Sequence, residues 1–136
     1  MTPRGTGRTR PVTRADVLVR AASAHKYLEV AALVADAEDP AERHVAASLA
    51  ALGAIAAADA ICGARLGVCA RGQDHGQAAD LLSTVPSCDR LAADLRAVLR
   101  DTSNAHYGTT FLSSERVASI LKHAGRLVDA VDSHLR

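Results

Sequence analysis

Apolar positions recur along most of this chain at the three- and four-residue spacing of an α-helix, and no stretch alternates as a strand would. The clearest pattern lies near the C-terminus, where the apolar residues from Val117 to Leu135 follow one stripe. We expect helices at about 14–37, 41–66, 74–82, 89–104 and 114–134. The pattern predicts an all-α fold: an up-down antiparallel helical bundle of four long or medium helices plus one short helix.

Local signals support these helix ends. Thr13 is an expected N-cap, and Asp16 three residues later completes an approximate capping box. Pro40 suits the first turn of the second helix, and Asp74 is a candidate N-cap of the short helix. Pro86 separates the short helix from the next one.

The second helix is apolar on nearly every side. Val45, Leu49 and Leu52 mark one face, and alanine fills most of the others. This pattern predicts a central helix, or one that contacts a second subunit. Asp59 interrupts the apolar stripe and should have a partner, because burial of an unpaired charge is unfavourable. His25, on an apolar stripe of the neighbouring helix, is the candidate partner.

Composition indicates one domain that gains stability by dimerising. Hydrophobic residues make up 49 % of the 136 residues, but they are mostly Ala, Leu and Val, which bury little area each. The net charge of +1 provides no overall attraction to nucleic acid. Residues 1–12 carry three arginines among Pro and Gly, and predict a disordered basic tail before a domain at 13–136. A solvated tail is favoured over one that contacts phosphates.

No pattern indicates a cofactor, a metal or a membrane. The three cysteines form no CxxC pair and are expected to be reduced thiols. No uninterrupted apolar run reaches the roughly 18 residues of a membrane span. The N-terminus lacks the apolar segment of a secretory signal, so we expect a cytoplasmic protein.

Candidate chemistry concentrates in the segment from Arg100 to Gly108. Here Arg100 and Asp101 precede His106 and Tyr107, which pairs a fixed cation with a group that titrates near neutral pH. Such a pair can bind and transform a phosphodiester. The alternative without chemistry is a surface arginine and a helix-terminal histidine, with Tyr107 packed under the last helix.

Arg100 and His106 are six residues apart, so they point about 120° apart on an unbroken helix. Both can contact one phosphate if the helix breaks at 102–104, where Thr, Ser and Asn are poor interior residues, or if two protomers combine their segments. A second pair, Arg71 and His75, lies near a glycine and an expected helix N-terminus, where backbone N–H groups can bind an anion. Helix capping and a surface histidine are the alternative for that pair.

Three short runs carry a family resemblance: residues 56–62 around Asp59, residues 71–75, and the Ala-His-Tyr-Gly run at 105–108. Together with the helix order, they resemble the HEPN domain (higher eukaryotes and prokaryotes nucleotide-binding), in its small actinobacterial branch, over about 13–135. The resemblance implies an all-helical homodimer, and many members are metal-independent endoribonucleases of toxin or defence systems.

The HEPN signature is an arginine, four to six residues with a polar one first, and a histidine. Arg100, Asp101 and His106 match it with five intervening residues. The resemblance implies catalysis by Arg100 and His106, with support from Asp101, Tyr107 and Asp59 and weaker RNA or nucleotide binding by Arg71 and His75. Other members do not cleave RNA. The alternative is therefore an interaction module that pairs with a nucleotidyltransferase or an antitoxin.

Overall fold

The chain folds into five helices and a two-stranded ribbon. The computed structural model describes residues 8–72, 75–107 and 110–136, with side chains for all of these except 104–107. The elements in order are β1 (Thr9–Pro11), α1 (Arg14–Val34), α2 (Pro40–Leu66), β2 (Val68–Ala70), α3 (Gly76–Ser83), α4 (Asp89–Tyr107) and α5 (Ser114–His134). The expected all-α helical bundle, with four longer helices and one short helix, is confirmed.

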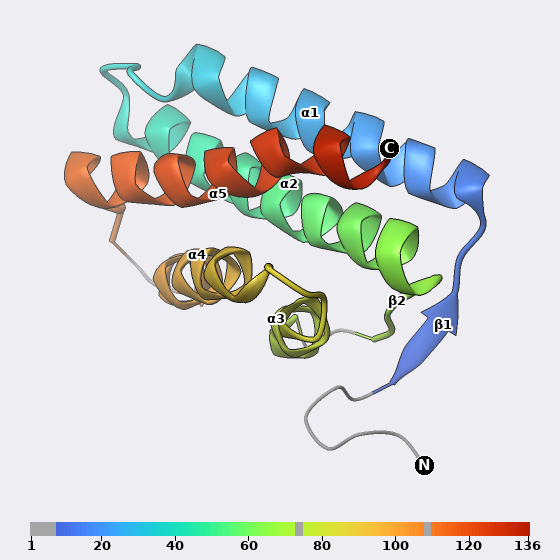
Figure 1. The fold of residues 1–136 in the computed structure, drawn as a ribbon. Coiled ribbons are helices and arrows are strands. Elements are labelled where there is room, and N and C mark those ends of the chain that lie inside the picture. Colours follow the sequence, from blue (N-terminus) through green and yellow to red (C-terminus); the bar gives the residue numbers. More distant parts are fainter. Residues whose placement is uncertain (1–7, 73–74, 108–109) are drawn as a thin grey trace.

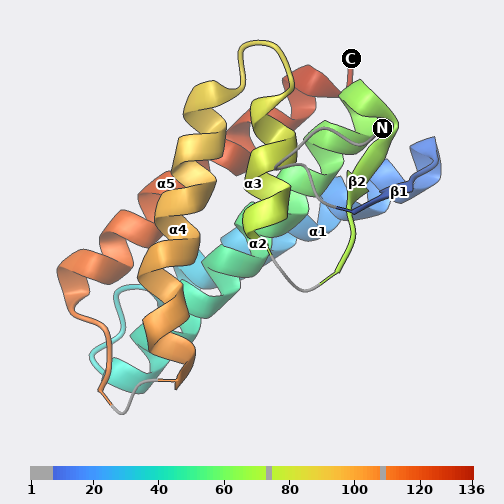
Figure 2. The ribbon, with the colours of Figure 1, turned by 90° about the horizontal axis from the view of Figure 1, so that it is seen from below.

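The helices form two layers. In Figure 1, α1, α2 and α5 lie side by side in one layer, and α3 and α4 lie beneath it, inclined to it. Figure 2 shows that α4 ends near the α1–α2 loop, whereas the ribbon and the start of α3 lie toward the other end of α2. The two ends of the bundle therefore carry different sets of polar residues.

Helix ends follow the local signals closely. The capping box is present, with the Asp16 amide donating to Thr13 Oγ1 at 3.1 Å and the Thr13 amide donating to Asp16 Oδ2 at 2.8 Å. Asp39 caps α2 through the Ala41 amide, and Gly67 ends α2 with a left-handed φ of 76°. α1 ends three residues earlier than expected, and α4 continues three residues beyond 104.

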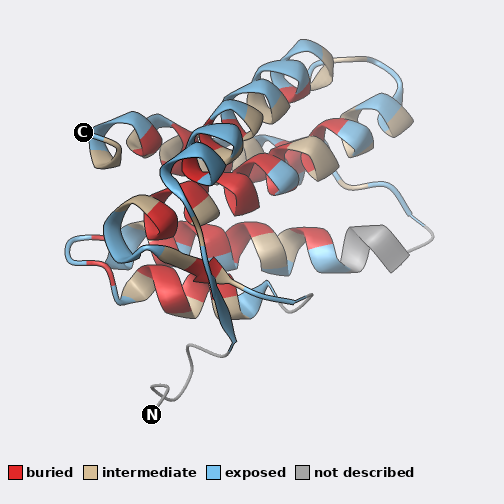
Figure 3. Ribbon diagram, turned by 90° about the vertical axis from the view of Figure 1, so that its right-hand side faces the viewer, coloured by how far each residue is buried: buried red, intermediate tan, exposed pale blue. Residues whose placement is uncertain are grey.

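α2 is the central helix and contacts all the other four. Its inward side consists mainly of alanines, and Figure 3 shows buried positions concentrated where the helices face one another. Ile55 and Ile61 are its larger buried residues, whereas Val45 and Leu52 are 52 % and 45 % exposed. Small inward side chains allow close packing on every side but bury limited apolar area.

Two glycines of α2 allow the neighbouring chain to approach closely. A Cβ at Gly63 would lie 2.7 Å from Val17 Cγ2 and 2.8 Å from Val12 Cγ2, inside van der Waals contact. A Cβ at Gly53 would lie 3.3 Å from the Ala24 carbonyl oxygen of α1. The glycines therefore set the distance at which α1 and the segment before it pack on α2.

The ribbon differs from the prediction of a disordered tail over residues 1–12. β1 pairs antiparallel with β2, Arg10 lies opposite Cys69, and the Val12 amide donates to the Gly67 carbonyl at 3.1 Å. The partner strand follows the whole of α1 and α2, so only folding of this helix pair brings it within reach of β1. Residues 1–7 lie outside the described residues.

Candidate functional site

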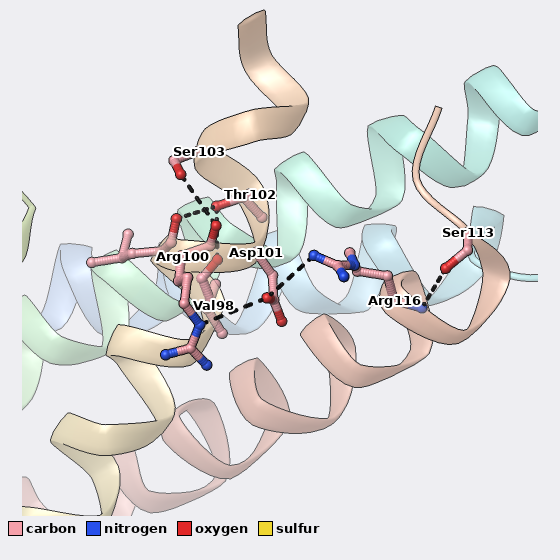
Figure 4. Close-up of polar contacts among 8 residues, drawn as sticks. Val98, Arg100, Asp101, Thr102, Ser103, Ser113 and Arg116 are labelled. Carbon is pink, nitrogen blue, oxygen red and sulfur yellow. Dashed lines mark hydrogen bonds and ion pairs between the residues drawn. The ribbon is translucent and has the colours of Figure 1, made fainter. Parts of the chain in front are cut away.

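Arg100 and Asp101 lie in the C-terminal half of α4 and meet the first turn of α5. Arg100 Nε is 4.0 Å from Asp101 Oδ1, and Arg116 Nη1 of α5 is 3.7 Å from the same oxygen. Figure 4 shows the two arginines approaching the carboxylate from opposite sides. The side chains of Arg100 and Arg116 are 73 % and 53 % exposed, whereas that of Asp101 is 19 % exposed. We call this set of three residues the α4–α5 corner.

The corner borders a polar hollow of about 390 Å³, lined by Asp101, Ser113, Glu115, Arg116 and Ser119. Ser113 caps α5 by accepting a hydrogen bond from the Arg116 amide at 3.2 Å, which holds the arginine's backbone in place. Glu115 adds a negative charge, so an anion would be bound by the guanidinium groups rather than by the helix start alone.

α4 is continuous through 102–104, so the break that would allow Arg100 and His106 of one chain to reach one phosphate does not occur. Thr102 Oγ1 donates to the Val98 carbonyl at 2.8 Å, and Ser103 Oγ donates to the Arg100 carbonyl at 3.1 Å (Figure 4). These bonds to preceding carbonyls satisfy the hydroxyl groups inside a continuous helix. The backbone positions of Arg100 and His106 therefore remain about 120° apart on one helix. The side chains of His106 and Tyr107 lie outside the described residues.

Asp59 has a partner, as expected, but the prediction that this partner is His25 is wrong. Asp59 Oδ2 accepts a hydrogen bond from Arg20 Nη2 at 2.8 Å, whereas His25 lies 3.1 Å from Asp132 of α5 and is exposed. Burial raises the pKa of Asp59, and the positive charge of Arg20 opposes that rise. The other cations that act on Asp59 are Arg10 and His75. Asp59 thus belongs to the ribbon end of α2 and not to the α4–α5 corner.

Arg71 and His75 lie on either side of a loop between β2 and α3, and both are exposed. α3 begins at Gly76 with His75 in the N-cap position, where its side chain makes no capping hydrogen bond. The predicted cap, Asp74, lies outside the described residues. Arg71 directly follows β2 and His75 directly precedes α3, whereas Arg100 lies in the C-terminal half of α4. Figures 1 and 2 show the ribbon and the end of α4 toward different ends of α2.

The sequence analysis missed a buried polar cluster between α4 and α5. Asp94, with 4 % of its side chain exposed, accepts hydrogen bonds at Oδ1 from Arg126 Nη1 at 3.1 Å and pairs with His123 Nδ1 at 2.7 Å. Its other oxygen, Oδ2, is buried without a hydrogen-bond partner among the described residues. A histidine held through Nδ1 directs its Nε2 away from the carboxylate, which is an arrangement suited to proton transfer.

The missed cluster had a signal in the spacing of charges. Asp94 and Asp101 are seven residues apart on α4, and Arg116 and His123 are seven apart on α5. Seven residues are about two turns, so each pair shares one helix face. Antiparallel packing then places Asp94 against His123 and Asp101 against Arg116. A seam of carboxylates on α4 and cations on α5 results.

The cysteines offer no nucleophile. Cys62, Cys69 and Cys88 are free and buried, and burial raises the pKa of Cys62 to about 12. Burial likewise raises the pKa of the other two thiols. A protonated thiol is a poor nucleophile and a poor metal ligand. In the part of the chain that the structure describes, no group of three or more His, Cys, Asp or Glu side chains is arranged to hold a metal ion.

Comparison of the chain with protein-family models, with curated proteins and with solved structures found no match. Among the described residues, α2 is the one helix that is long and apolar enough to cross a membrane. Of its most apolar 18-residue window, 72 % is buried inside the fold, as expected for a core helix.

Proposed function

We propose that this chain binds RNA at the α4–α5 corner and cleaves it without a metal, as a cytoplasmic endoribonuclease of toxin or defence type. The observation that carries the proposal is the pair of exposed arginines, Arg100 and Arg116, held on either side of the half-buried Asp101. Guanidinium groups bind phosphate oxygens through two parallel hydrogen bonds, and here two of them lie within ion-pair distance of one carboxylate. The resemblance to the HEPN domain supports a catalytic role for the same segment of α4.

The proposed reaction is an internal transfer at phosphorus. The ribose 2′-oxygen forms a bond to the adjacent phosphorus and loses its proton to a base, the bond from phosphorus to the 5′-oxygen breaks, and that oxygen takes up a proton. The products end in a 2′,3′-cyclic phosphate and a 5′-hydroxyl. Arg100 stabilises the charge that develops on the phosphoryl oxygens, and His106 transfers the protons.

A continuous α4 makes a homodimer part of this proposal. On one helix the positions of Arg100 and His106 point about 120° apart, which is too far for both to reach one phosphate. Two protomers that place their α4 ends together would supply Arg100 from one chain and His106 from the other. The proposed site is therefore shared between two copies of this chain.

The test is cleavage of structured and single-stranded RNA by purified protein in excess EDTA. Arg100→Ala and His106→Ala are each expected to lower the rate by about 100-fold or more. Arg90→Ala, which removes an exposed arginine at the other end of α4, is the matched control and should keep full activity. Products should carry a 2′,3′-cyclic phosphate.

Two results would contradict the proposal. Folded, dimeric wild-type protein that leaves every RNA intact would exclude the nuclease. Activity that survives in His106→Ala but is lost in His123→Ala would instead assign proton transfer to the histidine that Asp94 holds.

A second candidate function, a non-catalytic interaction module, is favoured by an exposed apolar face over α1 and α2. On α1, Val30 and Leu33 are 40 % and 80 % exposed, and Val45 and Leu52 of α2 lie on the outside as well. A hollow of about 330 Å³ is lined by residues of both helices, including Tyr27 and Leu49. Exposed apolar patches of this kind mark protein–protein contacts. The same face would serve either a second copy or a nucleotidyltransferase or antitoxin partner.

Leu33→Glu is expected to abolish whichever association this face makes, because it places a charge in an apolar contact. The matched control is Leu18→Glu, since Leu18 is 49 % exposed but lies about four turns away from Leu33 along α1. The measurement is molar mass by size-exclusion chromatography with light scattering.

A wild-type dimer that becomes a monomer in Leu33→Glu alone supports self-association through α1 and α2. A wild-type monomer that binds the product of a neighbouring gene, with loss of binding in Leu33→Glu, supports the interaction module. Association that is unchanged in Leu33→Glu would exclude this face as the contact surface.

A further inference from the structure

The ribbon brings Arg71 close to Arg8 and Arg10, which are about 60 residues away in the sequence. Thr9 lies opposite Ala70, and the Arg71 amide donates to the Arg8 carbonyl at 2.8 Å, which extends the pairing by one residue. Arg71 therefore lies opposite Arg8. Because side chains alternate along a strand, Arg8 and Arg10 share one face of the ribbon, and Arg71 shares it with them. We call Arg8, Arg10 and Arg71 the ribbon arginines.

The charge of the ribbon arginines is only partly compensated within the described part of the chain. All three are exposed, and no ion pair joins their side chains to another described residue. Arg10 acts through its charge on Asp16 and Asp59, but Asp16 accepts a hydrogen bond from the Thr13 amide and Asp59 is paired with Arg20 at 2.8 Å. Like charges directly opposite each other destabilise a strand pair. An anion bound between them would remove that repulsion.

The ribbon is also held in place, as a binding site requires. The Val12 amide donates to the Gly67 carbonyl at 3.1 Å, and the Arg8 amide donates to Gln77 Oε1 of α3 at 3.3 Å. These contacts fix both ends of β1 against α2 and α3. His75 is exposed at the N-cap position of α3, two residues before Gln77, which accepts the hydrogen bond from the Arg8 amide, so it lies near the ribbon. It adds a fourth group that can donate to an anion.

We propose that Arg8, Arg10, Arg71 and His75 form a phosphate-binding site at the ribbon end of the bundle. Its ligand is a phosphate group of a nucleotide or of an RNA strand. Guanidinium groups suit this ligand because their paired N–H donors match two phosphate oxygens. The site lies at the opposite end of α2 from the α4–α5 corner (Figures 1 and 2), so it does not depend on the proposed nuclease.

The test uses the full chain and four probes: inorganic phosphate, pyrophosphate, ATP and a short single-stranded RNA. Thermal unfolding is measured at constant ionic strength with chloride as the reference anion, and RNA binding is measured by fluorescence anisotropy. At ten times its Kd, a probe that binds is expected to raise Tm by roughly 3 to 6 °C. The double variant Arg8→Gln, Arg71→Gln should bind that probe with an affinity lower by about tenfold or more, because two charge-assisted contacts are lost.

Matched variants separate this site from general charge effects and from the nuclease. Arg90→Gln removes one exposed arginine elsewhere and should leave phosphate binding unchanged. The loss of response caused by Arg8→Gln with Arg71→Gln should also persist in an Arg100→Ala background, even if RNA cleavage is lost. A response to ATP alone identifies a nucleotide site. A response that is strongest with RNA, and whose salt dependence is weaker in the Arg8→Gln, Arg71→Gln variant, identifies a strand-binding site. Equal responses of wild type and the Arg8→Gln, Arg71→Gln variant to every probe would overturn the proposal.

Discussion

Replacement of both side chains that pair with Asp94, in the double variant His123→Leu, Arg126→Leu, is expected to lower the free energy of unfolding by about 3 to 5 kcal/mol. Asp94 has only 4 % of its side chain exposed, and its Oδ2 already lacks a partner among the described residues. Without His123 and Arg126, the carboxylate would be buried between α4 and α5 with no compensating charge. Urea unfolding followed by circular dichroism at neutral pH measures the change.

A triple variant distinguishes the buried charge from lost packing. Addition of Asp94→Leu to the double variant removes the charge, so at least half of the lost stability should return, as apolar replacements of buried ion pairs are often neutral or stabilising. A double variant within about 1 kcal/mol of wild type would show that the cluster has little effect on stability. A triple variant no more stable than the double would show that the loss comes from packing instead.

Arg20→Met is expected to lower the free energy of unfolding by about 2 to 4 kcal/mol near neutral pH, because it leaves Asp59 without its nearest cation. The Asp59 side chain is 14 % exposed, and burial already raises its pKa against the opposing effect of Arg20. Loss of Arg20 allows this pKa to rise further. A carboxyl whose pKa is higher in the folded than in the unfolded state destabilises the fold above that folded pKa. The penalty disappears as the pH falls through the folded pKa towards the unfolded value.

The loss of unfolding free energy in Arg20→Met should therefore be larger at about pH 7.5 than at about pH 4.5. Thermal unfolding of both proteins across this range measures it. Arg96→Met is the matched control: it breaks the exposed Arg96–Asp80 pair at 2.9 Å and should change stability by less than about 1 kcal/mol at either pH. The double variant Arg20→Met, Asp59→Leu should lose most of the pH dependence. A deficit independent of pH would mean that Arg20 contributes by packing alone.

The helices were predictable because their signals are local. The capping box of Thr13 and Asp16, the proline at 40 and the apolar stripe of α5 all act within one or two turns, and each has the expected place in the fold. The polar pairs were less predictable. The sequence restricted Asp59 to a partner on a neighbouring helix, but Arg20 and His25 both lie on α1. The rotation of α1 on α2, set in part by close approach at Gly53 and Gly63, decides between them.

The candidate site shows the same division. The sequence located Arg100 and Asp101 on α4, but not Arg116 of α5, which meets Asp101. It also singled out Arg71 and His75, whereas the pairing that sets Arg71 opposite Arg8 requires two strands separated by α1 and α2. The sequence left a helix break at 102–104 open because propensity alone disfavours Thr and Ser there. Their bonds to the Val98 and Arg100 carbonyls compensate inside the folded helix.

By itself, the sequence determined the five helices, most of their ends and the buried face of α5, because short-range periodicity and capping act within a segment. Only the tertiary structure decided which charges meet, that residues 9–11 form a strand, and that Val45 and Leu52 of α2 face outward while alanines face the core. α2 is apolar on nearly every side, so its own pattern leaves its orientation open. The helices packed around it select the face that is buried, since small side chains there allow the closest contact.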